Sequence, residues 1–134
     1  MDIKKFSVEP TARLPLLGSD DEPLLNEKGK ELAIVFFGPG SKQYAKAQAV
    51  QNNGIVDRLK KKGKTDQTAE QKLAETSQFL ADVTSEFENI DYDDLKDKAL
   101  FKAVYSDLSL GFISDQASKF LGDWSNFKPP SVSS

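Results

Sequence analysis

Cysteine and histidine are both missing from this chain of 134 residues. Without cysteine there is no disulfide framework, no thiol nucleophile and no thiolate zinc site. Without histidine the chain lacks the commonest general base at neutral pH and the commonest metal ligand. Few catalytic mechanisms remain, so we expect a protein that is not an enzyme and that uses no metal and no cofactor.

Long apolar runs are also missing. No stretch approaches the ~20 apolar residues of a membrane-spanning helix. The opening MDIKKFSVEP has two lysines but no apolar segment behind them, unlike a signal peptide. The net charge of −3 argues against general binding of nucleic acid. We therefore expect a cytoplasmic protein that binds neither membranes nor nucleic acid.

The residues that are present suffice for one folded domain, which we place at 1–127. Phe6 and Val8 alternate with polar neighbours, which predicts a short strand. Pro15 indicates an edge strand or an irregular extended segment, and the apolar run Leu32–Phe37 predicts a buried central strand. Together these segments predict a small antiparallel sheet of two or three strands within about residues 5–37.

The remainder, about 41–127, is predicted to be helical. The expected helices cover about 41–62, 65–89, 93–107 and 112–127. The fold class is thus mainly α with a small N-terminal antiparallel β region, an α+β fold. The proline- and serine-rich 128–134 is predicted to be a disordered tail.

The first of these helices has a predicted weak point. Asn52-Asn53-Gly54 is expected to break or bend it. Beyond that point we expect Ile55, Val56 and Leu59 to face the core while the cations around them face water. The third helix is expected to bury Leu95, Ala99, Leu100, Ala103 and Val104.

Helix starts are marked by residues that cap exposed backbone N–H groups. Ser41, after Gly38-Pro39-Gly40, is a natural N-cap, and the glycine spacing does not fit a phosphate-binding P-loop. Thr65 or Thr68 is expected to cap the second helix, and Asp91 or Asp93 is expected to cap the third.

The acidic run that begins at Asp91 does not fit a calcium-binding EF-hand loop, since Lys96 occupies the position where an EF-hand needs glycine.

Two separated segments carry a resemblance to a known family. The apolar Val35–Phe37 leads into the Gly38–Ser41 turn and a helix. The later part of the pattern comprises Tyr105, Asp115, Gln116, Asn126 and Phe127. In this order the chain resembles the tail assembly chaperones of long-tailed, lambda-type bacteriophages and prophages. The resemblance extends over about residues 11–127.

The resemblance implies a non-catalytic factor of the bacterial host cytoplasm that is absent from the mature virion. Such chaperones coat the tape-measure protein before the tail tube polymerises around it. Many also exist in a longer, frameshifted form that recruits tail-tube subunits. The resemblance further implies self-association into a spiral or ring.

Two kinds of contact residue follow for such a protein. Oppositely charged clusters on separate helices are candidates for contacts between copies, although a solvated helix end is the plainer interpretation of the basic one. The basic cluster is Arg58, Lys60, Lys61 and Lys62, and the acidic cluster is Asp91, Asp93 and Asp94. The candidates for partner binding are Phe112, Phe120, Trp124 and Phe127.

Core packing is the competing interpretation of these aromatic residues. An apolar stripe usually faces inward, which favours the core for Phe112 and Phe120. For Trp124 and Phe127 the two interpretations are balanced, because both lie beyond Gly122. We predict that this outer end reaches a partner.

Two alternative functions stay open from the sequence. One is a structural virion subunit, such as a tail-tube or head–tail joining protein. The other is an enzyme that uses carboxylates such as Asp82 and Glu86, which are expected one helical turn apart. Without partner groups these two resemble solvated surface.

Overall fold

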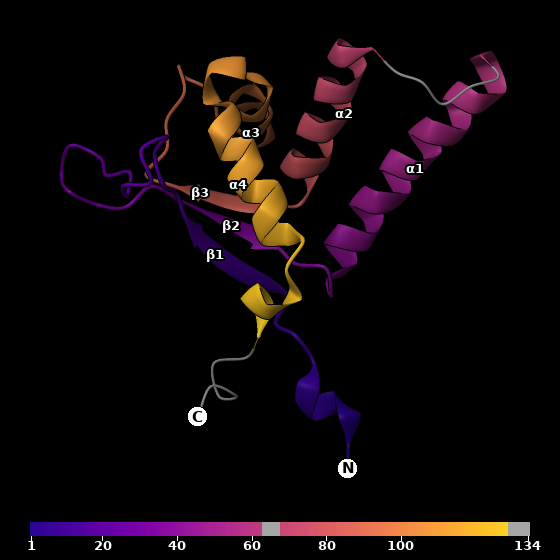
Figure 1. Cartoon of the computed structure of the whole chain (residues 1–134), viewed down its shortest axis with the longest axis horizontal. Coiled ribbons are helices and arrows are strands. Elements are labelled where there is room, and N and C mark those ends of the chain that lie inside the picture. The colour runs from indigo at the N-terminus through magenta and orange to yellow at the C-terminus, as the bar shows by residue number, and fades with distance from the viewer. Residues whose placement is uncertain (63–67, 129–134) are drawn as a thin grey trace.

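The computed structural model describes residues 1–62 and 68–128. Within them, three antiparallel strands form a sheet in the order β1-β2-β3, and helices pack over one of its faces (Figure 1). The strands are β1 (Thr11–Pro15), β2 (Ala33–Phe37) and β3 (Thr84–Glu88). The α-helices are α1 (Lys42–Lys62), α2 (Ala69–Asp82), α3 (Asp97–Ser106) and α4 (Gly111–Leu121). This arrangement confirms the predicted α+β class.

The central strand β2 is the apolar run that the sequence predicted. Ile34 and Phe36 are fully buried beneath the helices. The edge strand β1 pairs with β2 from Thr11, opposite Phe37, to Pro15, opposite Ala33. Pro15 is therefore the last residue of an edge strand, a position where its missing N–H does little harm.

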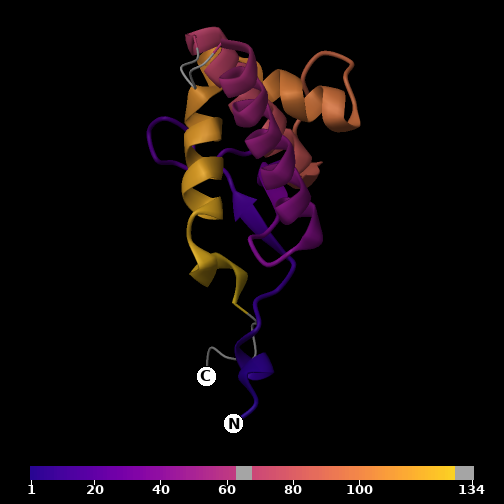
Figure 2. The same ribbon diagram turned by 90° about the vertical axis from the view of Figure 1, so that its right-hand side faces the viewer.

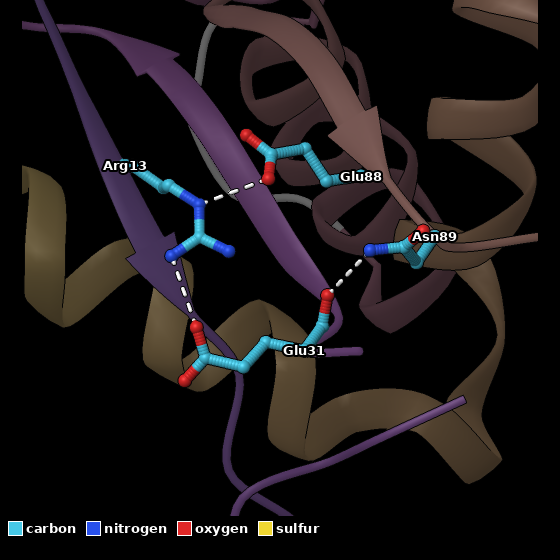
Figure 3. Close-up of polar contacts among 4 residues, drawn as sticks. All are labelled: Arg13, Glu31, Glu88 and Asn89. Atoms are coloured by element: carbon cyan, nitrogen blue, oxygen red, sulfur yellow. Dashed lines mark hydrogen bonds and ion pairs between the residues drawn. The ribbon is translucent and has the colours of Figure 1, made fainter. Parts of the chain in front are cut away.

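A charged network spans the other face of the sheet (Figure 3). The Arg13 guanidinium on β1 donates to Glu88 on β3 at 2.9 Å and to Glu31 at 3.2 Å. The Asn89 amide donates to the backbone oxygen of Glu31 at 2.8 Å. The hydrogen bonds to Glu88 and Glu31 raise the pKa of Arg13. Because the partners are partly exposed, the network fixes strand register more than it adds stability.

The strand predicted around Phe6 and Val8 is not formed. Residues Ile3–Phe6 form a short 3-10 helix, η1, and Phe6 is exposed. The sheet begins only at Thr11 because its partner Phe37 is the last residue of β2. The adjoining Pro10 carbonyl then accepts a hydrogen bond from the Gly38 N–H at 2.8 Å, which closes this end of the sheet.

The predicted helix over 65–89 is two elements. Thr68 caps α2 as expected: its hydroxyl accepts from the Gln71 N–H at 3.1 Å, and the Gln71 side chain accepts from the Thr68 N–H at 2.9 Å. The helix ends at Asp82, and β3 then adds to the free edge of β2. Thr84 fixes the junction, because its hydroxyl donates to the Leu80 carbonyl at 2.7 Å.

The predicted break in α1 is also wrong. Asn52-Asn53-Gly54 lies inside one continuous helix, and Ile55, Val56 and Leu59 are exposed rather than buried. Figure 2 shows α1 running along the outside of the molecule. Its predicted cap is confirmed, since the Ser41 hydroxyl accepts from the Tyr44 N–H at 3.1 Å.

The packing of α1 against α2 explains these exposures. The α1 residues that are partly or fully buried follow one line at steps of three and four residues. They are Tyr44, Ala47, Gln51, Gly54 and Arg58. Gly54 lies at this contact, where a Cβ would be 3.5 Å from the Glu75 carboxylate, an ordinary van der Waals distance. The apolar residues beyond Gly54 are off this line and remain in solvent.

The third helix starts later than predicted. It begins at Asp97, and the N-cap is Lys96 without a side-chain bond, so neither Asp91 nor Asp93 caps it. Asp93 and Asp97 both have positive φ, 52° and 55°, which turns the chain between them.

This turn changes which α3 residues reach the core. Leu100 and Val104 are buried as expected, and Ala103 is half-buried. Leu95 and Ala99 are exposed, contrary to prediction. Leu95 precedes the helix, so the helical periodicity used to place it does not apply there.

The last predicted helix, 112–127, is interrupted. The 3-10 turn η2 (Leu108–Leu110) precedes α4, α4 ends at Leu121, and a separate 3-10 helix, η3, covers Trp124–Phe127. Gly122 is the C-cap at this interruption. The sequence predicts a disordered tail over 128–134. Residues 129–134 of this segment lie outside the described residues.

Candidate partner-binding surface

The C-terminal aromatic residues point in different directions. Phe127 is only 1% exposed, whereas Trp124 is 57% exposed. The Phe127 ring meets Phe120 edge-on at 5.5 Å and lies so close to Gly38 that a Cβ there would overlap it. The prediction that Phe127 reaches a partner is therefore wrong, because η3 turns its side chain back into the core.

The other two aromatic candidates are half-buried. Phe120 packs on the core with its ring 5.9 Å from that of Phe36. Phe112 packs against the same core. Of the four predicted partner-binding aromatics, Trp124 alone is mainly in solvent.

Three polar residues of the family resemblance, Gln116, Asn126 and Tyr105, make contacts within the fold. The Gln116 amide clamps the backbone of Leu17, accepting from its N–H at 2.9 Å and donating to its oxygen at 2.6 Å. The Asn126 amide donates to the Phe120 carbonyl at 2.9 Å. Tyr105 is buried, and its hydroxyl is 2.7 Å from that of Thr84. Burial raises the pKa of Tyr105, so it stays a neutral hydrogen-bonding group.

The predicted basic cluster is only partly available to a partner. Arg58 is ion-paired with Glu75 on α2, so it belongs to the α1–α2 contact. Lys60 and Lys61 are exposed. Lys62 ends α1, but its side chain lies outside the described residues.

The predicted acidic cluster lies in the loop before α3. Asp91, Asp93 and Asp94 are all exposed. Figure 1 places this loop and α1 on opposite sides of the molecule. The structure therefore does not bring the two charged clusters together within one chain, and their pairing between copies stays a prediction.

The predicted carboxylate pair is separated. Asp82 ends α2 and Glu86 lies on β3, so they are not one helical turn apart. Asp82 accepts from Lys98 and from Gln78, each at 2.9 Å. Among residues 1–62 and 68–128 there is no group of three or more acidic side chains arranged to hold a metal ion.

A second polar network caps the end of α3. Asp107 accepts from the Ser109 hydroxyl at 2.6 Å, from the Ser109 N–H at 2.9 Å and from the Tyr92 hydroxyl at 2.9 Å. The bonds from Ser109 and then Tyr92 lower the pKa of Asp107, and its carboxylate raises the pKa of Tyr92. This network secures the turn into η2.

Comparison with known proteins does not assign the chain to a family. The chain matches no protein-family model, no curated protein and no solved structure. None of the helices in the described ranges has both the length and the apolarity needed to cross a membrane.

The surface that the sequence interpretation missed is the outer side of α1. Two of its large apolar residues are substantially exposed: Val56, 45% exposed, and Leu59, 50% exposed. A signal was present, because Ala45, Ala49, Val56 and Leu59 recur along a line of the helix that differs from the line of Tyr44 and Ala47, and only one of these lines can face α2. The expected break at Asn52–Gly54 concealed that continuity.

Proposed function

We propose that this protein is a non-catalytic tail assembly chaperone of a long-tailed phage or prophage. It binds the tape-measure protein in the host cytoplasm during tail assembly and is absent from the mature virion. A longer, frameshifted form recruits tail-tube subunits. Copies of the chain associate into a spiral or ring.

The observation that carries this proposal is the exposed apolar side of α1. A chaperone for a long apolar client must present apolar side chains without burying them in its own core. Val56 and Leu59 are 45% and 50% exposed on α1, which packs on α2 by a different side. The helix is held in place by the Ser41 cap and the Arg58–Glu75 pair, so the surface is preformed.

The residues behind the family resemblance support the proposal in a second way. Its first motif, the Gly38–Ser41 turn, contacts its last residue, Phe127. Gln116 ties α4 to the segment after β1. The distant parts of the pattern therefore meet in the folded chain, as the proposal expects of residues that one fold requires.

A structural virion subunit is the alternative. Tail-tube proteins are mostly β, whereas the sheet in the described residues has three short strands and the helices dominate. The observed architecture therefore argues against a tail-tube protein.

Mass spectrometry of purified particles and of tail assembly intermediates tests the proposal. A chaperone is expected in intermediates together with the tape-measure protein, and missing from finished particles. Finding the chain in particles at the copy number of a tube or joining protein would establish the alternative instead.

A further inference from the structure

The outer side of α1 carries a regular line of mostly apolar and small residues. Its members are Ala45, Ala49, Asn52, Val56 and Leu59, all of them exposed. The spacing of four, three, four and three residues aligns them along the helix. At 3.6 residues per turn, this line lies roughly 140° around the helix from the line that packs on α2. We call these five residues the outer stripe.

The outer stripe has the geometry of a helix-packing seam. Spacing of this kind is the one through which two helices interlock side chains along their length. The stripe runs for about 21 Å, at 1.5 Å per residue, which matches about four turns of a partner helix. Ala45 and Ala49 allow the partner backbone to approach closely at one end, while Val56 and Leu59 supply apolar contact at the other.

Charge beside the stripe indicates what kind of helix binds there. Lys42 and Lys60 border it near its two ends, and both are exposed. If the stripe paired with the same stripe of a second copy, lysines would face lysines, which is unfavourable. A partner helix with acidic residues beside its own apolar line would instead form pairs with these lysines.

A membrane surface is the other candidate for a basic helix with exposed apolar residues. Helices that lie in membranes anchor with large side chains such as Trp, Phe and Leu. The outer stripe has two alanines, an asparagine and a single leucine. It is therefore suited to close contact with another helix and poorly suited to insertion among lipids.

We propose that the outer stripe of α1 is a docking site for one amphipathic helix of a partner protein, with an apolar line at three- and four-residue spacing and acidic residues beside it. The proposal rests on the proposed function only in taking this helix to be a segment of the client. The docking site itself depends only on the side chains of α1.

The test uses the full chain and two designed peptides, each long enough for about four to five helical turns. Both carry the same line of Leu and Ala at three- and four-residue spacing; one has Glu beside the line and the other has Lys. We expect the Glu peptide to bind by fluorescence anisotropy at least about tenfold more tightly than the Lys peptide, with the difference shrinking as salt rises. Equal binding of the two peptides, or binding of neither, would overturn the proposal.

Variants locate the site. Val56→Gln with Leu59→Gln should weaken binding of the Glu peptide strongly while the thermal melt stays near that of the parent, because both side chains are already exposed. Leu108→Gln removes an exposed leucine outside α1 and should leave binding unchanged. Unchanged binding by the α1 variant would contradict the assignment.

Vesicles containing phosphatidylserine test whether the outer stripe binds a membrane surface instead. We expect no binding to them in a flotation assay; binding that is lost in the α1 variant would show that the stripe serves a lipid surface and would overturn the proposal. If the Glu peptide binds but the tape-measure protein is not kept soluble, the docking site stands and the chaperone function fails.

Discussion

At the scale of single residues, Phe127 and Trp124 illustrate how a short distance along the chain reverses a side chain's role. Phe127 is in the core and Trp124 is in solvent. Phe127→Ala should therefore lower the free energy of unfolding by about 3–5 kcal/mol, as for other buried aromatic residues. Trp124→Ala should change it by less than about 0.5 kcal/mol.

Urea unfolding followed by circular dichroism measures both variants. Fluorescence of the single tryptophan adds a check on the wild type, since an exposed indole is readily quenched by acrylamide. A strongly destabilised Trp124→Ala variant, together with a protected indole, would mean that η3 is oriented otherwise.

Asp107 supplies a prediction about pH. Its hydrogen bonds lower its pKa below the ordinary 3.8, so the folded state favours the carboxylate. A group of this kind stabilises the fold above its unfolded pKa, and that contribution disappears as pH falls through the folded pKa. The stability difference between wild type and Asp107→Ala should therefore be larger at neutral pH and narrow below about 3.8. Thermal melts across this range measure it, and a difference that widens with acid would contradict the assigned network.

At the scale of elements, the continuity of α1 gives the sharpest test. Gly54 lies within the helix, and a Cβ there would make only ordinary contacts. Gly54→Ala should therefore raise the stability by about 0.5–1 kcal/mol, because alanine has less backbone entropy to lose.

Gly29→Ala is the matched control. Gly29 has open space around it but a φ of +76°, so alanine there should cost about 1–2 kcal/mol. Chemical denaturation compares the two variants directly. A Gly54→Ala variant as destabilised as Gly29→Ala would restore the predicted break in α1.

The elements also show how far sequence reasoning extends. The strand β2 and the Ser41 and Thr68 caps could be predicted, because an apolar run and a capping residue act through local physics. The strand β3 could not be predicted in this way. Val83 and Phe87 fit a helical stripe extended from α2, and what makes Thr84–Glu88 a strand is pairing with β2, about fifty residues earlier.

The candidate site was harder to predict than the fold. Exposure of Val56 and Leu59 depends on where α2 lies, which periodicity alone does not determine. Burial of Phe127 depends on its contact with Gly38, a residue remote in sequence. In both cases the decisive information is a tertiary contact, so the aromatic end was favoured as the partner-binding surface and α1 was overlooked.

At the scale of the whole molecule, charge separation predicts how copies associate. Lys60 and Lys61 on α1 and the acidic loop before α3 lie on opposite sides of the chain. Contacts between unlike surfaces join copies head to tail, and they weaken when salt screens the charges. We expect analytical ultracentrifugation to show larger species at low ionic strength that dissociate as salt is added.

Reversing the charge of one cluster provides the control for this association. Lys60→Glu with Lys61→Glu should reduce association at low salt, and combining it with Asp93→Lys and Asp94→Lys should partly restore it. If the chain is monomeric at every salt concentration and protein concentration, the predicted charge-paired assembly is wrong.

The proposed function is tested most directly by the solubility of a tape-measure protein encoded beside this chain, expressed with and without it. If the proposed function is correct, the tape-measure protein is insoluble alone and becomes soluble and co-purifies when the chain is present. The Val56→Gln, Leu59→Gln variant should fold but lose this effect. A tape-measure protein that is equally insoluble in the presence of the folded wild-type chain would contradict the proposed function.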